Sequence, residues 1–366
     1  MSELCPRLHS QFKATAAVGA MMIEDFDGDG CLELALGTTD GSLLIVRLLD
    51  DSSSHYPPPV AAVGELGLIT TLCYGDLFNT GVKVIATINF AGGLRCIRLD
   101  KLSGNKSDWL RPCFEQPLPA NIDFSYITDL DQDGETELLV ALTDRVVRTY
   151  RFVPSDAPND ASSNLYQNGH LLPLNKWEVP AQITALALSA DNRLFLSQPT
   201  FNYVRLNLAY DGETDENGVE SPENSVDFVV PDWVNEHQLV LAATVGTTYA
   251  FVPRHASVVA LFYTLISNVA IVENNETMAF LSFPPPDYQC CWIKSLNFEA
   301  RQLVLTADWS GCLLIFVADR MYRVKIASNL RKITAKLVEL EKCLVIAVAT
   351  ISEDAFIYKL SLDKLL

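Results

Sequence analysis

The sequence lacks the features that mark secreted and membrane-spanning chains. Its nine cysteines form no CxxC motif and are odd in number. The start, Met1 to Pro6, has neither a basic segment nor a continuous apolar segment, so no secretory signal is predicted. The longest apolar run, Val258 to Val272, falls short of the roughly 18 residues that a membrane span needs, and we interpret it as a buried hairpin. These absences favour a reducing, cytoplasmic compartment without direct membrane insertion.

Positive charge is also scarce. The chain has 27 lysines and arginines against 45 aspartates and glutamates, which gives a formal net charge of −18. Nucleic acid and anionic membrane surfaces repel such a chain, so neither is predicted as its direct partner. Hydrophobic residues make up 49% of the sequence, which is enough to bury a substantial core.

Motifs of catalysis are missing as well. The five histidines are scattered without metal-ligand spacing, and no GxSxG, Walker or GxGxxG motif is present. Ser310, between Trp309 and Gly311, is interpreted as a turn residue because no base is paired with it in the pattern. The sequence therefore predicts a protein that is not an enzyme.

What the sequence does contain is a repeated Asp-rich loop of the form DxDxDG. Full copies begin at Asp25 and Asp129, and a worn copy that keeps one acid of three begins at Asp76. The copies are roughly 52 residues apart, a period typical of propellers and solenoids. At this period the chain has room for about seven repeats.

The loop pattern suits a hard cation. Aspartates at positions 1, 3 and 5 can converge on one ion, the glycine permits the turn, and a glutamate at position 9 adds a carboxylate. The candidate ligands are Asp25, Asp27, Asp29 and Glu33 in the first loop, and Asp129, Asp131, Asp133 and Glu137 in the other. We expect weak, structural calcium sites that are mostly empty in the cytosol. The alternative is that aspartate and glycine simply make good turns here.

The fold is predicted from a repeating unit of three strands that occurs seven times along the sequence. Its second and third strands form hairpins over Glu33–Leu49, Val84–Leu99, Leu138–Phe152, Leu194–Leu208, Val258–Val272, Leu303–Val317 and Leu344–Leu360. Six further segments with strand-like sequence connect these three-strand units. Helical periodicity is nearly absent, with residues 327–340 the only ambiguous stretch.

The missing seventh connector is supplied by residues 8–14, which would complete the last blade and close the ring. We therefore predict an all-β fold, a single seven-bladed β-propeller of four-stranded blades over residues 1–366. An acidic loop is expected as an insert at residues 211–224. The alternative architecture is an open β-solenoid or a pair of sandwiches.

The loops resemble the FG-GAP repeat of integrin α-subunit propellers, which carries calcium between the first two strands of a blade. A second resemblance covers more of the chain. It is carried by Arg111–Phe114, Pro119–Asn121, Asp129–Val140, Thr143–Arg148, Lys176-Trp177, Ser197–Pro199 and Ala307–Gly311. In these segments the chain is similar to the cytosolic integrin-alpha FG-GAP-repeat-containing protein two family, whereas residues 211–295 match that family poorly.

The resemblance implies a non-enzymatic scaffold in the KICSTOR complex, which tethers the GATOR complex to lysosomes and restrains nutrient-responsive TOR signalling, a part of amino-acid sensing. Its implied partners are a kaptin-like propeller, a very large scaffold subunit and GATOR. The implied location is cytoplasmic and peripheral at the lysosomal membrane. Two alternatives stay open: a calcium-dependent ligand-binding or adhesion propeller of integrin α type, and an FG-GAP-bearing enzyme such as a polysaccharide lyase.

Overall fold

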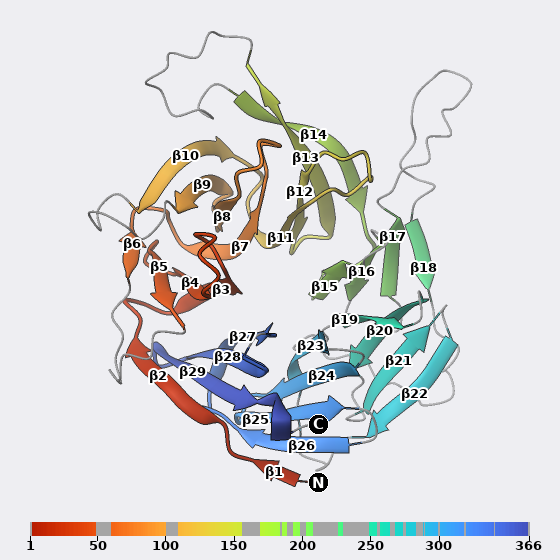
Figure 1. The fold of residues 1–366 in the computed structure, drawn as a ribbon. Helices are drawn as coiled ribbons and strands as arrows, with labels where there is room; N and C mark the ends of the chain where they lie inside the picture. The colour runs from red at the N-terminus through yellow and green to blue at the C-terminus, as the bar shows by residue number, and fades with distance from the viewer. Residues whose placement is uncertain are drawn as a thin grey trace.

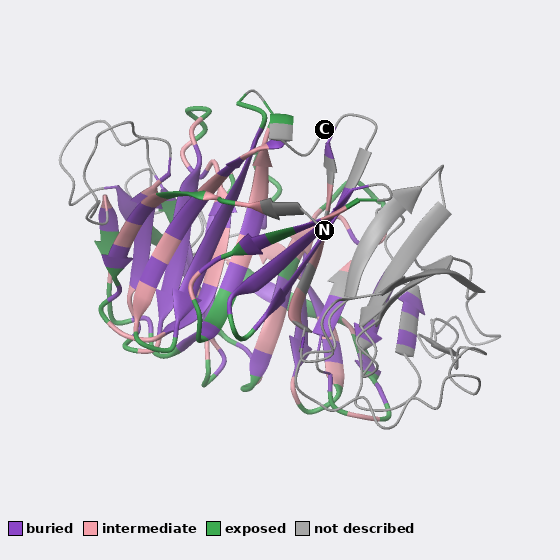
Figure 2. Cartoon of the chain, turned by 90° about the horizontal axis from the view of Figure 1, so that it is seen from below, coloured by how far each residue is buried: buried purple, intermediate pink, exposed green. Residues whose placement is uncertain are grey.

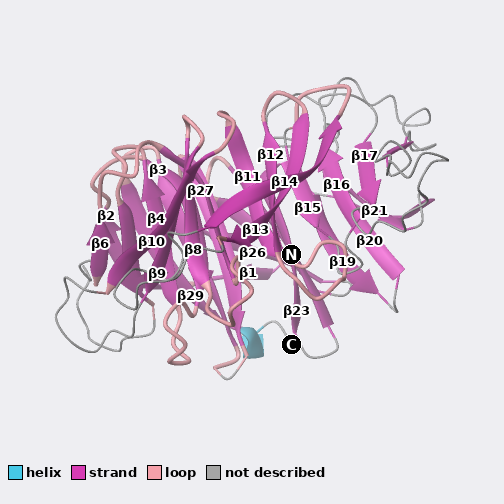
Figure 3. Cartoon of the chain, turned by 90° about the horizontal axis from the view of Figure 1, so that it is seen from above, coloured by secondary structure: helices cyan, strands magenta, loops and turns pink. Residues whose placement is uncertain are grey.

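In the residues that it describes, the computed structural model consists of short β-strands and a short 3₁₀ helix, η3 (Leu362–Lys364). Figure 3 shows these strands running between two rims of loops. Within the described residues, no helix is long and apolar enough to cross a membrane. The structure describes residues 2–48, 60–99, 109–155, 169–183, 185–188, 193–197, 203–207, 226–229, 249–254, 257–263, 268–273, 276–282, 288, 290–298, 301–317, 320–339 and 341–364.

The strands pair into antiparallel sheets of four, arranged around a ring in chain order (Figure 1). The first three sheets contain β3 (Val18–Glu24), β4 (Glu33–Thr38), β5 (Leu43–Arg47) and β6 (Ala61–Val63); β7 (Ile69–Gly75), β8 (Val84–Asn89), β9 (Gly93–Leu99) and β10 (Leu110–Pro117); and β11 (Ile122–Thr128), β12 (Glu137–Leu142), β13 (Val146–Pro154) and β14 (Gly169–Glu178).

The next two sheets contain β15 (Ala185–Leu188), β16 (Arg193–Ser197), β17 (Tyr203–Asn207) and β18 (Val226–Val229); and β19 (Tyr249–Arg254), β20 (Ser257–Tyr263), β21 (Asn268–Glu273) and β22 (Glu276–Ser282). The last two contain β23 (Cys290–Phe298), β24 (Arg301–Asp308), β25 (Cys312–Val317) and β26 (Arg320–Lys325); and β27 (Leu330–Val338), β28 (Cys343–Thr350) and β29 (Asp354–Ser361).

Two N-terminal strands join the last two sheets. The strand β2 (Arg7–Lys13) pairs antiparallel with β29, as expected for residues 8–14. A strand that the sequence did not predict, β1 (Ser2–Leu4), pairs parallel with β26. The N-terminal segment therefore connects two neighbouring sheets.

The seven predicted hairpins are all present, since each second strand pairs antiparallel with the third strand of its sheet. The ambiguous stretch 327–340 contains the strand β27. The predicted insert at residues 211–224 lies outside the described residues.

The core is divided among the gaps between neighbouring sheets. One apolar cluster combines β12 residues such as Leu138 with β8 residues such as Val84, and another combines Leu34 on β4 with Val345 on β28. Middle strands such as β4 and β12 are buried along their whole length, because both faces of each sheet are covered. In Figure 2 the buried residues fill the strands and the exposed ones gather at the loops.

Candidate functional site

The three Asp-rich loops occupy equivalent places. They join β3 to β4, β7 to β8 and β11 to β12, the first and second strands of three consecutive sheets. In each loop the glycine at position 6 donates its backbone N–H to the aspartate at position 1: Gly30 to Asp25 at 3.0 Å, Gly81 to Asp76 at 2.6 Å, and Gly134 to Asp129 at 3.0 Å. The aspartate at position 1 therefore holds the turn even in the worn copy, which explains why that acid alone remains there.

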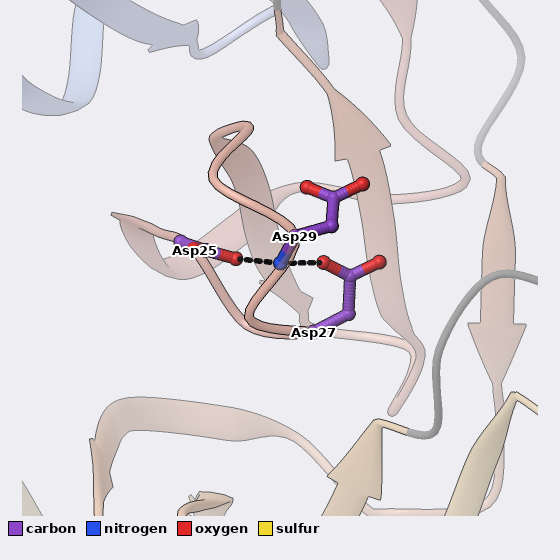
Figure 4. Close-up of side chains that lie close together, drawn as sticks. All are labelled: Asp25, Asp27 and Asp29. Atoms are coloured by element: carbon purple, nitrogen blue, oxygen red, sulfur yellow. Dashed lines mark hydrogen bonds between the residues drawn. The ribbon is translucent and has the colours of Figure 1, made fainter.

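The first loop brings three of its four predicted ligands together. Carboxylate oxygens of Asp25, Asp27 and Asp29 lie within 4.8 Å of one another. The N–H of Asp29 donates to Asp25 Oδ1 at 3.2 Å and to Asp27 Oδ1 at 3.1 Å (Figure 4). Glu33 stands outside this group, at the base of the loop.

The other full copy gathers a different subset of its predicted ligands. Oxygens of Asp129, Asp131 and Glu137 meet within the same distance of 4.8 Å, while Asp133 is not part of the group. The N–H of Glu135 donates to Asp133 Oδ1 at 2.8 Å. The two loops therefore share a backbone shape and differ in which carboxylates converge.

The glutamates at position 9 are buried and support the loops from below. The N–H of Phe26 donates to Glu33 Oε2 at 3.1 Å, and that of Leu130 donates to Glu137 Oε2 at 2.8 Å. Their side chains are 0% and 2% exposed. Burial raises the pKa of Glu33 to about 7 and also raises the pKa of Glu137.

An arginine on the third strand of the same sheet reaches into each loop. Arg47 on β5 forms ion pairs with Asp27 at 3.5 Å, with Glu33 at 3.4 Å, and with Asp29. Glu33 and Arg47 are register partners across the β4–β5 pair, so the pleat places both side chains on one face of the sheet.

Arg151 on β13 repeats this arrangement in the other loop. It lies 3.0 Å from Asp131, 2.8 Å from Asp133 and 3.4 Å from Glu135, and it also pairs with Glu137. Glu137 and Arg151 are again register partners. One guanidinium therefore contacts four carboxylates here and three in the first loop.

Burial and these contacts shift the pKa values of aspartates at positions 3 and 5 of the loops. Burial alone would raise the pKa of Asp29, but the N–H of Cys31 and the charge of Arg47 outweigh it, and the pKa is lowered. The backbone N–H of Glu135 and the charge of Arg151 lower the pKa of Asp133. Burial raises the pKa of Asp131.

Neighbouring loops also contact one another. The hydroxyl of Tyr74, on β7, donates to the backbone oxygen of Asp25 at 3.3 Å. The N–H of Thr136 donates to Asn79 Oδ1 at 2.7 Å, which links the worn copy to the last one. Hydrogen bonds therefore join the first loop to β7, and the loop that follows β7 to the last loop.

The donor set fits a divalent cation, since clustered carboxylate oxygens are the ligands that calcium prefers. Each loop, however, already has an arginine in ion-pair contact with several of these acids. Arg47 and Arg151 were not singled out by the sequence, although each follows its position-9 glutamate by 14 residues. The calcium sites stay a prediction.

The chain matches the sequence profile of a family described as "Integrin-alpha FG-GAP repeat-containing protein 2" over residues 53–244. It is 26% identical over 362 residues to the KICSTOR complex protein ITFG2 of Bos taurus, covering 90% of this chain and 65% of that protein. It is 29% identical over 221 residues to the Mus musculus protein of the same name, covering 57% of this chain and 47% of that protein. The chain thus spans about half to two thirds of the length of these curated relatives.

The solved structures with a similar fold include chains of two other proteins. A crystal structure of BBS1N in complex with ARL6DN, soaked with lead, has a TM-score of 0.62 at 12% identity, covering 98% of this chain and 97% of that one. Chaetomium thermophilum Raptor has a TM-score of 0.62 at 9% identity, covering 97% of this chain and 28% of that one. At such low identity these likenesses concern the fold alone.

Proposed function

Because the chain belongs to the integrin-alpha FG-GAP repeat-containing protein 2 family, we propose that it is a non-enzymatic, protein-binding scaffold subunit of a KICSTOR complex. The names of the bovine and murine relatives support the complex. The chain matches only part of each relative. The partners named below are therefore proposed for this chain.

The proposed scaffold is one seven-bladed propeller over residues 1–366, closed where β2 joins β29. Seven sheets in chain order, the clusters packed between neighbouring sheets, and the β2–β29 pairing support this architecture. Propellers place their turns on two rims, which leaves two broad faces for partner proteins.

The observation that carries the proposed function is a set of four exposed apolar side chains, three in turns between second and third strands and one in the connection before β7. Phe90 and Ile351 lie in turns between second and third strands and are 58% and 64% exposed. Trp309, in the corresponding turn of another sheet, is 39% exposed, and Leu68, just before β7, is 43% exposed. Apolar groups gathered at turn tips are typical of protein-binding surfaces.

These four residues, which we call the apolar turn surface, are fixed by backbone hydrogen bonds. The N–H of Phe90 donates to Leu68 O at 2.8 Å. On the other side of the first sheet, the N–H of Asn329 donates to Trp309 O and that of Ile351 donates to Asn329 O, each at 3.0 Å. In a propeller these turns share the rim opposite the acidic loops, so the acidic and apolar faces are separate.

The test is co-purification of the full chain with the other KICSTOR subunits. We expect Phe90→Ser combined with Ile351→Ser to reduce recovery of a partner subunit at least about tenfold, because interface hot spots are apolar and rigid. The matched control is Leu8→Ser combined with Leu172→Ser, since these outer-strand leucines are 47% and 45% exposed. Both variants should melt like the wild type.

Equal recovery with both variants would place the interface elsewhere on the propeller. Failure of the wild type to recover any KICSTOR subunit would refute the scaffold role. Recovery of glycans or extracellular ligands would instead support the calcium-dependent adhesion alternative.

Within the complex we propose a kaptin-like propeller and a very large scaffold subunit as direct partners, and GATOR as the cargo held at lysosomes. The chain would then act at the cytoplasmic face of the lysosome through its partners and restrain TOR signalling when amino acids are scarce. Cells without the protein should keep TOR substrates phosphorylated during amino-acid starvation. Normal dephosphorylation in such cells would contradict this role.

A further inference from the structure

The two full acidic loops contain a cation of their own. Arg47 and Arg151 stand at the same spacing from the position-9 glutamate, in the same strand of their sheets, and each contacts the acids at positions 3, 5 and 9. The arginines are only 25% and 22% exposed, so these ion pairs are partly shielded from solvent.

We propose that Arg47 and Arg151 act as built-in cations that take the place of a metal in the two acidic loops. The loops then keep their shape without a divalent ion, and such an ion binds only by displacing the guanidinium. The arginine therefore occupies each site in the absence of a metal ion and competes with such an ion for the carboxylates.

The chemistry of the guanidinium supports this role. It is planar, always charged, and carries five N–H donors, so one group can bind several carboxylates at fixed angles. In the last loop its Nε lies 2.8 Å from Glu137 Oε1 while Nη2 lies 2.8 Å from Asp133 Oδ2. This guanidinium therefore bridges Glu137 and Asp133, two of the four acids that the sequence assigns as calcium ligands.

The worn copy provides an internal comparison. Phe78, Thr80 and Val84 replace the acids at positions 3, 5 and 9, while Asp76 still accepts the N–H groups of Thr80 at 3.1 Å and Gly81 at 2.6 Å. The turn therefore forms with one acid, which accepts two backbone N–H groups. The acids that vary between copies are the ones that the arginines contact in the full copies.

The experiment compares melting temperatures in chelator and in 1 mM calcium for three proteins. The wild type should shift by less than about 1 °C. Arg47→Gln combined with Arg151→Gln should melt about 2 to 6 °C lower in chelator and regain most of this loss in calcium. Arg98→Gln, at the corresponding place in the worn copy, removes the same charge and should resemble the wild type in both buffers.

A further variant covers a failure of the double arginine variant to fold. Adding Asp29→Asn and Asp133→Asn to it removes one acid from each loop and should restore folding without calcium. If this quadruple variant remains unfolded, the arginines do not act by charge compensation. A wild-type calcium shift as large as that of the arginine variants, or no calcium response in those variants, would also overturn the proposal.

Discussion

At the residue scale, glycines with the same backbone conformation carry different constraints. Gly92 has a φ of 88°, and a Cβ there would lie 2.2 Å from the backbone oxygen of Leu118. Gly81 has a φ of 78°, but a Cβ there would meet nothing within 4 Å. The first position needs glycine for both its dihedral angle and its space, and the second needs it only for the angle.

We therefore expect Gly81→Ala to lower the free energy of unfolding by about 1 kcal/mol, the cost of a left-handed alanine. Gly92→Ala should lower it by about 2 to 4 kcal/mol, because the turn must also move away from Leu118. Urea unfolding of both variants measures the difference. Equal losses would mean that the turn around Gly92 adjusts freely.

A lysine between sheets offers a second residue-scale prediction. Lys294 on β23 donates from Nζ to the backbone oxygen of Ala335 on β27 at 2.7 Å, and beside it Lys336 pairs with Glu24. Burial, together with the charge of Lys336, lowers the pKa of Lys294 to about 8. The unfolded chain therefore binds more protons at this site between about pH 8 and pH 10.5, and stability should rise with pH across that window.

The measurement is the stability of the wild type relative to Lys294→Met from pH 7 to pH 10.5. The difference should change by about 1 to 3 kcal/mol in favour of the wild type as the amine loses its proton. Below pH 8 it should stay constant. A flat difference over the whole range would show that Lys294 is hydrated in the folded state.

At the element scale, the hairpins could be predicted from the sequence, whereas strand β1 and the acid–arginine pairs could not. Short apolar runs around Gly, Asn and Asp turns located every second and third strand, because period and turn chemistry are local. The strand β1 has three residues and pairs parallel with β26, so it has no periodic pattern to detect. The acid–arginine pairs depend on register across a hairpin, and Glu33 faces Arg47 only once that register is fixed.

The N-terminal strands lead to a prediction at this scale. Deleting residues 1–14 removes β2 with the buried Phe12 and opens the edge of β29, so aggregation or a loss above about 3 kcal/mol is expected. Deleting residues 1–5 removes only β1 and should cause a smaller loss. Thermal melting compares the two. If the longer deletion melts like the intact chain, β2 is dispensable.

At the scale of the whole molecule, the thiols report on packing and redox state together. Free thiols are found at Cys5, Cys31, Cys73, Cys96, Cys113, Cys291, Cys312 and Cys343. Burial raises the pKa of Cys73 to about 12, so its reactive thiolate is rare, whereas Cys5 is exposed.

A thiol reagent should modify Cys5 quickly in the native protein and the buried thiols slowly. After denaturation without reductant, all nine cysteines should react. Cys5→Ser should remove the fast phase. Two or more pairs that stay unreactive in freshly isolated protein would indicate disulfides and revive the adhesion alternative.

The pairing of β2 with β29 also determines when the molecule can finish folding. Residues 7–13 leave the ribosome well before their partner strand, residues 354–361, is made. At typical elongation speeds the nascent β2 waits on the order of 20 to 70 s, its apolar side uncovered while the other sheets assemble. The sheet therefore stays incomplete until β29 has emerged, and a chaperone that shields the β2 segment during synthesis would raise the yield of native protein.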